Sequence, residues 1–153
     1  MANIATKGKC QDALSDPGLE HLAIANPQTA PYGVAAQQVM EHLGVLDKMR
    51  PKLVLGENIS QTLQFVASKS ANAGFVAKSS VVDGADGARA ACEWMVPDEL
   101  YAPINQKMVV LNQSKAKPVV LAFWQFMQTA EATAIIGKNG YGVPRLKKNK
   151  AHR

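Results

Sequence analysis

Two short turns, each lying between an apolar run and a helical pattern, carry the chemistry that this sequence suggests. The first follows the apolar residues 22–25 and leads through Asn26 and Pro27 into Ala-Pro-Tyr-Gly at 30–33. The second follows the apolar residues 53–55 and leads through Gly56 into Glu-Asn-Ile-Ser-Gln at 57–61. A helix that begins at the carboxyl end of a parallel strand points amide N–H groups and the positive end of its dipole into a crevice. Two such helices side by side predict a site for a small anion.

An anion at this site would be held by main-chain dipoles, because neither turn contains Lys or Arg. Neutral N–H and O–H donors bind a tetrahedral dianion in a dry cleft when enough of them converge. The simpler interpretation is that both turns only connect elements, as strand-to-helix loops do in every α/β protein. Glu57 would repel a dianion if it pointed inward, so we expect it to face outward or to cap the helix.

The sequence shows no arrangement of residues typical of catalysis or of metal binding. His21, His42 and His152 do not have the spacing of metal ligands. Residues 83–87 look like a calcium loop, but they are too short for an EF-hand, so we expect a turn there. We therefore predict that the chain is not an enzyme and carries no metal and no cofactor.

The two cysteines, Cys10 and Cys92, are far apart in the sequence. Two thiols at this separation do not indicate a disulfide framework or a metal site. We expect one of them to be a surface thiol and the other to lie in a strand.

Length and charge are those of one ordinary domain with a basic end. The chain has 153 residues, of which 47% are hydrophobic, so it can bury a core. Its formal net charge is +5, and residues 144–153 carry five basic residues and no acid, so residues 1–143 are formally neutral. We expect this tail to be solvated, and nucleic acid is not an expected partner.

No stretch approaches the roughly 20 continuous apolar residues of a membrane-spanning helix, so no membrane insertion is expected. The N-terminal residues also lack the apolar run of a signal peptide. If the chain is the whole gene product, it is expected to stay in the cytoplasm, unless a leader has been removed.

The remaining pattern alternates strands with helices, which favours an α/β fold: a three-layer sandwich with a mostly parallel sheet. A short helix or turn is expected at 12–19 and a connection at 46–52. The predicted strands are residues 21–25, 53–55, 74–77, 92–96 and 107–111. The predicted helices are residues 34–43, 58–68, 118–128 and 130–138. Gly44 ends the first of them, and a capping box of Asn58 and Gln61 opens the second.

Several short motifs in a fixed order carry a family likeness. They are Ala-Ile-Ala-Asn-Pro at 23–27, Ala-Pro-Tyr-Gly at 30–33, Pro-Lys-Leu at 51–53, Gly-Glu-Asn-Ile at 56–59, Ala-Gly-Phe-Val at 73–76, and Ala-Ile-Ile at 134–136 with Gly-Tyr-Gly at 140–142. In this order the chain resembles the molybdate-binding proteins of bacterial ABC importers, which are class II periplasmic solute-binding proteins. The resemblance extends over residues 14–144.

The resemblance implies a particular division of the chain. Members of the family have two lobes with the ligand between them, and this sequence starts where lobe two starts. Residues 1–113 correspond to a lobe-two-like α/β domain, residues 114–143 to C-terminal helices that pack on lobe one in the family, and residues 144–153 to a basic tail. The first half of lobe one, with its hydroxyl ligands, has no counterpart, so the chain is expected to be a truncated form.

The resemblance also implies which residues face the ligand. The backbone amides of Tyr32 and Ile59 match the lobe-two ligands, whereas Ala77 stands where some members have a tyrosine hydroxyl. Because half of the donors would face open water, we expect the anion, molybdate or tungstate, to bind at millimolar concentration or more weakly. Cavity size would select against sulfate. The residues expected next to the ligand are Pro31, Gly33, Asn58, Ala77 and Lys78, with Ser79 and Ser80 as further donors nearby.

Partners and location follow from the same resemblance. An ABC permease and the periplasm are implied by the family. Without lobe one, the apolar helices at 118–138 must be covered in another way, and we expect a homodimer through these helices rather than their folding back on this lobe. The alternative function is a structural or dimerising remnant without transport and with little or no anion binding.

Overall fold

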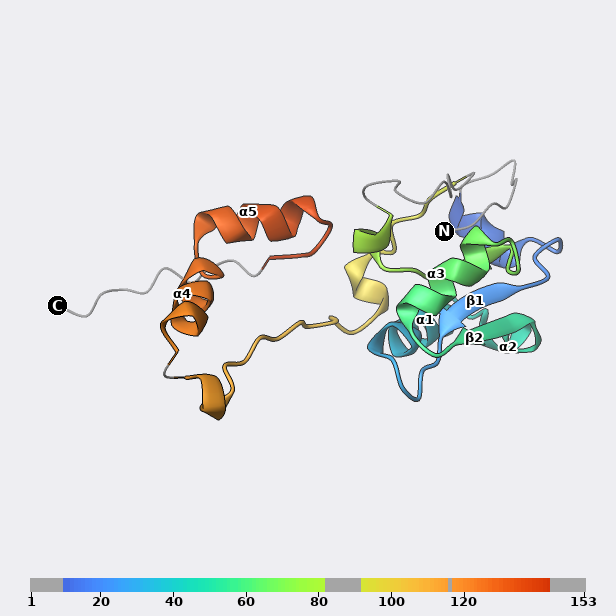
Figure 1. The fold of residues 1–153 in the computed structure, drawn as a ribbon. Coiled ribbons are helices and arrows are strands. Elements are labelled where there is room, and N and C mark those ends of the chain that lie inside the picture. The colour runs from blue at the N-terminus through green and yellow to red at the C-terminus, as the bar shows by residue number, and fades with distance from the viewer. Residues whose placement is uncertain (1–9, 82–91, 116, 144–153) are drawn as a thin grey trace. The chain divides into compact units, whose positions relative to one another are not determined.

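The computed structural model describes residues 10–81, 92–115 and 117–143, and the chain divides into two units (Figure 1). Unit 1 is Met1–Asn105 and unit 2 is Gln106–Arg153. Each unit is described by itself below.

Unit 1 is built on a small parallel sheet with the strand order β2-β1-β3. The central strand β1 (Leu22–Ala25) is buried at all four residues, as expected of an apolar strand covered on both faces. It pairs in parallel with β2 (Leu53–Gly56) and with the two-residue strand β3 (Ala73–Gly74). β2 lies at the edge, and its Leu55 is 51% exposed.

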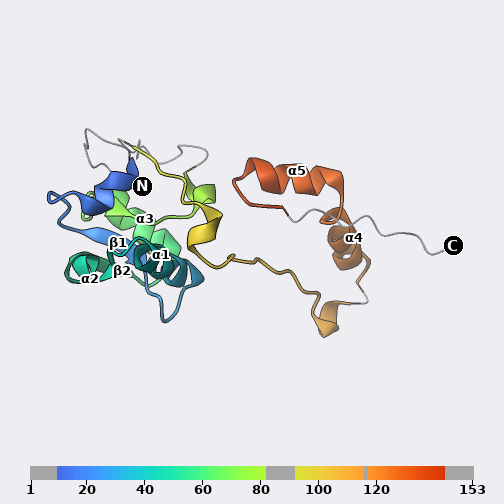
Figure 2. The same cartoon turned by 180° about the vertical axis from the view of Figure 1, so that it is seen from behind.

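Helices α1 (Pro31–His42) and α3 (Ile59–Ala67) make the crossovers between these strands. The connection through α1 leads from β1 to its neighbour β2, whereas the connection through α3 passes back over β1 to β3. Since parallel crossovers are right-handed, connections in opposite directions place their helices on opposite faces of the sheet. Figures 1 and 2 view this three-layer arrangement from its two sides, so the predicted α/β sandwich with a parallel sheet is confirmed for unit 1.

The core of unit 1 is aliphatic and lies between β1 and the helices. Leu22 and Ile24 of β1 and Met40 of α1 are almost completely buried. Met49 joins them from α2 (Leu46–Met49), which with a 3-10 helix (Arg50–Lys52) occupies the stretch expected to be only a connection. A 3-10 helix at Cys10–Ser15, called η1, adds Leu14 to the same core.

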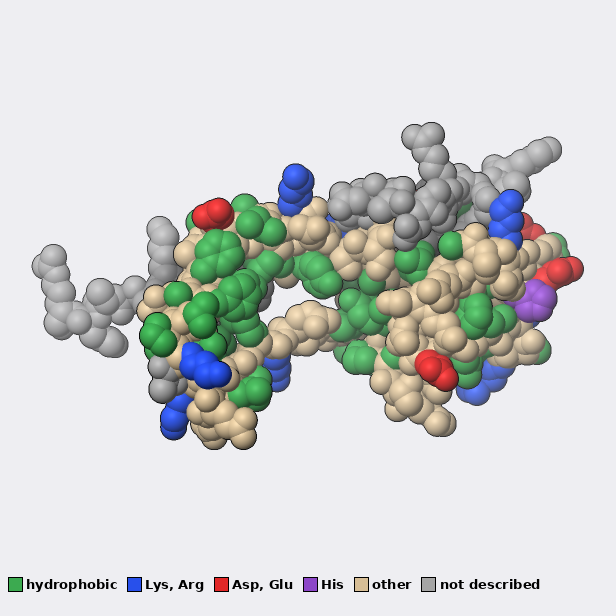
Figure 3. Space-filling model, viewed as in Figure 1, with side chains coloured by type: hydrophobic (Ala, Val, Ile, Leu, Met, Phe, Trp, Pro, Cys, Tyr) green, Lys and Arg blue, Asp and Glu red, His purple; other side chains and the backbone are tan. Residues whose placement is uncertain are grey.

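Unit 2 contains two short helices, α4 (Pro118–Phe126) and α5 (Ala130–Lys138). Thr129 caps α5 by accepting a hydrogen bond from the Ala132 amide at 3.2 Å. Val119 and Phe123 of α4 are 73% and 56% exposed, and Figure 3 shows hydrophobic side chains over both helices. α4 therefore presents an apolar surface to solvent.

The predicted strands at residues 92–96 and 107–111 are wrong, because neither segment has regular secondary structure. A strand needs a partner for its backbone groups, and both segments lie outside the sheet, which comprises β1, β2 and β3 in the described residues. The third strand is also shorter than the predicted 74–77, although the Phe75 amide still donates to the Ala23 carbonyl at 3.0 Å. The turn predicted at 83–87 lies outside the described residues.

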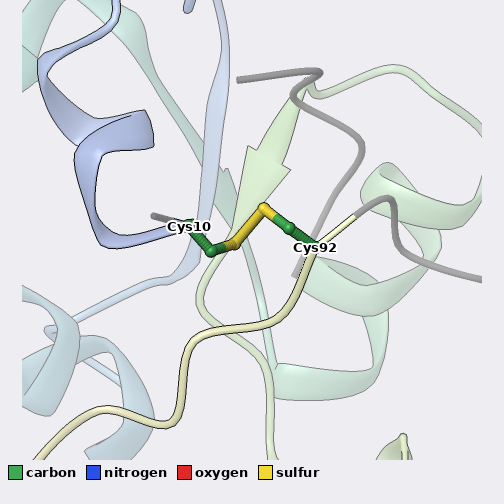
Figure 4. The surroundings of a disulfide bond; sticks show 2 residues. All are labelled: Cys10 and Cys92. Carbon is green, nitrogen blue, oxygen red and sulfur yellow. A yellow bond between two sulfur atoms is a disulfide. The ribbon is translucent and has the colours of Figure 1, made fainter. Parts of the chain in front are cut away.

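The expectation of two separate thiols is also wrong. Cys10 and Cys92 form a disulfide with their Cα atoms 5.6 Å apart (Figure 4). The residues are 82 positions apart in sequence, and Cys92 lies outside any strand. The chain returns to η1 only after the whole sheet has been built, so sequence separation gave no indication that these residues are neighbours.

No single helix in the described ranges is long and apolar enough to cross a membrane. α4 and α5 reach that length and composition only when they are taken together, and they are bent by 67° at the break between them.

Candidate functional site

The two turns singled out in the sequence lie side by side. Ala25 and Gly56, the last residues of β1 and β2, are partners in the parallel register. Beyond them, the Asn26 amide donates to the Gly56 carbonyl at 2.7 Å. The Thr29 hydroxyl lies 3.4 Å from both the Asn26 and the Glu57 carbonyl oxygens, so it can donate to either turn. Both helices thus begin at the edge of the sheet where the strands end, and the two connections leave for opposite faces, as at the ligand sites of open α/β sheets.

α1 begins with Pro31, whose fixed φ suits the first helical position. The N-cap residue Ala30 is extended and offers no side-chain cap, while its carbonyl accepts from the Gly33 amide at 2.9 Å and the Val34 amide at 3.3 Å. Tyr32 is the second residue of the helix and is half-buried. The N-terminal positions of α1 therefore have no side chain of their own to cap them, which is the arrangement that suits an external anion.

α3 begins with a reciprocal capping box. The Asn58 side chain accepts from the Gln61 amide at 2.9 Å, and the Gln61 side chain accepts from the Glu57 amide at 2.6 Å. The predicted capping box is therefore confirmed for the Asn58 cap, whereas Gln61 caps the amide one residue before the N-cap rather than the amide of Asn58 itself. Among the hydrogen bonds of the described residues none uses the amide of Ile59, the first residue of α3. Asn58 and Glu57 are both exposed, in agreement with the expectation that the Glu57 carboxylate faces outward.

Two glycines allow each helix to start close to its strand. A Cβ at Gly33 would collide with the Ala25 carbonyl oxygen and would lie 2.7 Å from the Pro27 nitrogen. A Cβ at Gly56 would lie 2.8 Å from the Thr62 hydroxyl, which is completely buried in α3. The glycines thus set the distance between strand and helix N-terminus in both turns.

The third predicted position follows β3, the other neighbour of β1. Ala77 is buried and precedes a 3-10 helix at Lys78–Ser80, in which Lys78 is exposed. Parallel pairing puts the ends of β2, β1 and β3 at the same edge of the sheet. At Ala77, however, the side chain is a methyl group and offers no hydrogen-bond donor. The next residue, Lys78, carries an ammonium group.

A further segment, residues 98–102, is hydrogen-bonded to α1. Nothing in the sequence indicated this contact. The Ala102 amide donates to the Gln38 side chain at 2.8 Å, and the Tyr101 hydroxyl donates to Asp98 at 3.0 Å. Burial raises the pKa of the Tyr101 hydroxyl above its usual 10.0, and the hydrogen bond and charge of Asp98 and the nearby Tyr32 raise it further. The hydrogen bond from Ala102 to Gln38 therefore holds this segment against α1.

Main-chain donors at helix N-termini are groups of the kind that hold anions, and the described residues contain no cluster of His, Cys, Asp and Glu that could hold a metal ion. Tyr32, with its neighbours Pro31 and Gly33, and Ile59, with its neighbour Asn58, are brought to one edge of the sheet by the pairing of β1 with β2. Sequence reasoning missed Thr29, whose hydroxyl reaches both turns. Its position inside the first turn was the signal that could have found it.

The chain is similar to known proteins of one family. The family of bacterial extracellular solute-binding proteins matches residues 3–142. The molybdate-binding protein ModA of Rhodobacter capsulatus is 46% identical over 123 residues, which are 80% of this chain and 47% of that protein. ModA of Azotobacter vinelandii is 43% identical over 135 residues, which are 85% of this chain and 51% of that protein. The chain thus spans about half the length of the curated relatives that it matches.

A solved structure agrees with these sequences. The periplasmic molybdate-binding protein of Azotobacter vinelandii superposes with a TM-score of 0.80 and 33% identity, covering 94% of this chain and 62% of that one. These relatives are binding proteins and not enzymes, and molybdate is their ligand rather than a cofactor.

Proposed function

This chain belongs to the family of bacterial extracellular solute-binding proteins, and from that premise we propose that it binds a tetrahedral oxyanion, molybdate or tungstate. The observation that carries the proposal is the pairing of Ala25 with Gly56, extended by the hydrogen bond from Asn26 to Gly56. It brings two helix N-termini to one edge of a sheet. The identity of the anion is inferred from the relatives, since the two ModA proteins described above bind molybdate.

In this proposal the ligands are the backbone amides of Tyr32 and Ile59. Pro31 and Gly33 shape the first turn and Asn58 the second, while Ala77 and Lys78 border the site on the β3 side. Two helix dipoles stabilise the dianion in place of a buried cation. Because these donors approach from one side only and water competes on the other, we expect a dissociation constant in the millimolar range, about −4 kcal/mol.

The test is an NMR titration of the labelled chain with molybdate, tungstate and sulfate at constant ionic strength. We expect saturable shifts that are largest at the amides of Tyr32 and Ile59 for molybdate and tungstate, and none for sulfate. If all three anions leave these amides unchanged, the chain is better described as a structural or dimerising relative that has lost anion binding.

We also propose that the chain works in the periplasm as the solute-binding component of an ABC importer, with the permease as its partner. The similar Azotobacter vinelandii protein is a periplasmic one. The Cys10–Cys92 disulfide supports the same compartment, because disulfides persist in oxidising environments such as the periplasm and are rare in the cytoplasm.

Finally, we propose that residues 1–113 act as a lobe-two-like binding domain and residues 114–143 as helices for assembly, followed by the basic tail at 144–153. The apolar surface of α4 and α5 supports a homodimer through these helices, since an apolar surface of this kind is costly in water.

A further inference from the structure

The Cys10–Cys92 disulfide encloses almost every element of unit 1. All three strands and helices α1, α2 and α3 lie between the two cysteines in the sequence. We infer that this disulfide is the clasp of unit 1, so that its reduction strongly destabilises the folded unit and makes its stability dependent on the redox state.

On the Cys10 side, the disulfide fastens a segment that completes the core but is too short to be stable alone. η1 spans six residues and buries Ala13 and Leu14 in the core cluster. Its contact with the rest of unit 1 includes one long-range hydrogen bond, from the Lys48 ammonium to the Ser15 carbonyl at 3.2 Å. An exposed hydrogen bond of this kind contributes little, so burial and the covalent bond make large contributions to holding a helix as short as η1.

On the Cys92 side, the fastened segment has no ladder to hold it. Residues 92–97 have no regular secondary structure, yet the Trp94 side chain packs against the core cluster. The disulfide therefore joins two segments that cover the core, one carrying Leu14 and the other carrying Trp94. When the bond is broken, the covalent link between these two segments is lost, and both lie outside the sheet that holds the strands together.

The size of the ring determines how strongly the disulfide stabilises unit 1. A cross-link between residues 82 positions apart removes a large part of the conformational freedom of the unfolded chain. For a loop of this length the expected effect on the folding equilibrium constant is on the order of a thousandfold.

The chemistry is a two-electron exchange. A dithiol reductant attacks one sulfur as a thiolate, the Cys10–Cys92 bond breaks, and a mixed disulfide forms. The second thiol of the reductant then displaces the protein thiol, which leaves two protein thiols and one oxidised, cyclic disulfide. The reverse reaction needs a disulfide oxidant of the thiol-exchange class.

If the proposed anion binding is correct, the clasp also controls it, because both helix N-termini of the site belong to the enclosed segment. The inference itself does not depend on anion binding. It concerns whether unit 1 stays folded, which can be measured without any ligand.

The experiment uses Trp94 as the reporter for unit 1. The full chain contains two tryptophans, and Trp124 belongs to α4 in unit 2, so W124F leaves Trp94 alone. Urea unfolding of W124F is followed by fluorescence with and without dithiothreitol, and the double variant C10S/C92S in the same background is the matched control. We expect reduction to lower the folding constant on the order of a thousandfold, the double variant to behave like the reduced protein, and the reductant to leave the double variant unchanged.

Coincident unfolding curves for oxidised W124F, reduced W124F and the double variant would overturn the inference. Two free thiols titrated in the denatured, unreduced protein would overturn it as well. If molybdate causes no NMR shifts in a protein whose stability still depends on reduction, the proposed function is contradicted and the inference about the disulfide stands.

Discussion

In the proposed site Ile59 acts through its main chain, because it is the first residue of α3 and its amide has no acceptor within the helix. The Asn58 and Gln61 side chains satisfy the amides on either side, those of Glu57 and Gln61. A donor of this type is fixed by the backbone and does not need to be ordered when a ligand arrives.

A substitution can remove this donor without breaking the helix. Proline is well accepted at the first helical position, and the extended Asn58, at φ −150° and ψ 174°, is compatible with a following proline. We expect Ile59→Pro to fold, with a stability loss of about 1 kcal/mol from reduced packing, and to weaken molybdate binding about tenfold or more. The measurement is the same NMR titration, read at the Tyr32 amide.

Ile59→Ala is the matched control, because it removes the side chain and keeps the N–H group. It should bind the anion about as well as the parent chain. Equal binding by the proline variant would show that this amide is not a ligand.

At this scale the sequence predicted what depends on local spacing. The capping box of Asn58 and Gln61 is a pattern of neighbouring residues and was predicted correctly. The disulfide and the contact of Gln38 with Ala102 join residues 82 and 64 positions apart, and no local pattern marks such pairs. The roles of Tyr32 and Ile59 as ligands stay predictions.

Among the elements, α1 is fitted closely to its strand at one end and is open at the other. Gly33 lies in its first turn against the end of β1, whereas Gly44 follows its last turn with φ +66° and has nothing near its missing Cβ. The two glycines therefore serve different purposes, close approach for Gly33 and a left-handed backbone for Gly44.

These purposes predict different costs. Gly33→Ala must displace either the helix or the loop at Ala25 and Pro27, so we expect a loss of about 3 kcal/mol in the free energy of unfolding. Gly44→Ala meets no atom and should cost only about 1 kcal/mol, through backbone strain. Urea unfolding of both variants measures the difference, and equal costs would contradict the close packing of α1 on β1.

The element predictions succeeded where a segment's pattern is sufficient to specify its structure. β1, β2 and helices α1, α3, α4 and α5 were predicted within a few residues, because apolar periodicity and capping residues mark them, whereas α2 was expected to be only a connection. Residues 92–96 and 107–111 have apolar, β-prone side chains, but a strand also requires a partner edge, which is a property of the assembled sheet.

For the molecule as a whole, the open question is what covers unit 2. Nine residues of α4 contain no charged side chain, and several of them are exposed. A helix that is apolar on all sides is normally buried. The proposed homodimer would bury this surface against a second copy.

Sedimentation of the oxidised chain tests this proposal. We expect a dimer at tens of micromolar, and we expect Phe123→Glu to shift it to a monomer, because a carboxylate would have to be desolvated in the interface. Gln125→Glu adds the same charge on the same helix at a residue that is already polar and should leave the dimer unchanged. A compact monomer of the parent chain at these concentrations would contradict the proposal.

The covalent ring between Cys10 and Cys92 also makes the two parts of the chain respond differently to proteolysis. A single protease cut anywhere inside the ring leaves its fragments attached to each other until the disulfide is reduced, whereas a cut after Cys92 releases everything beyond it. Since α4 and α5 lie entirely beyond Cys92, they can be shed from the chain by one peptide-bond cleavage. The sheet that carries the two turns would survive such damage in one covalent piece.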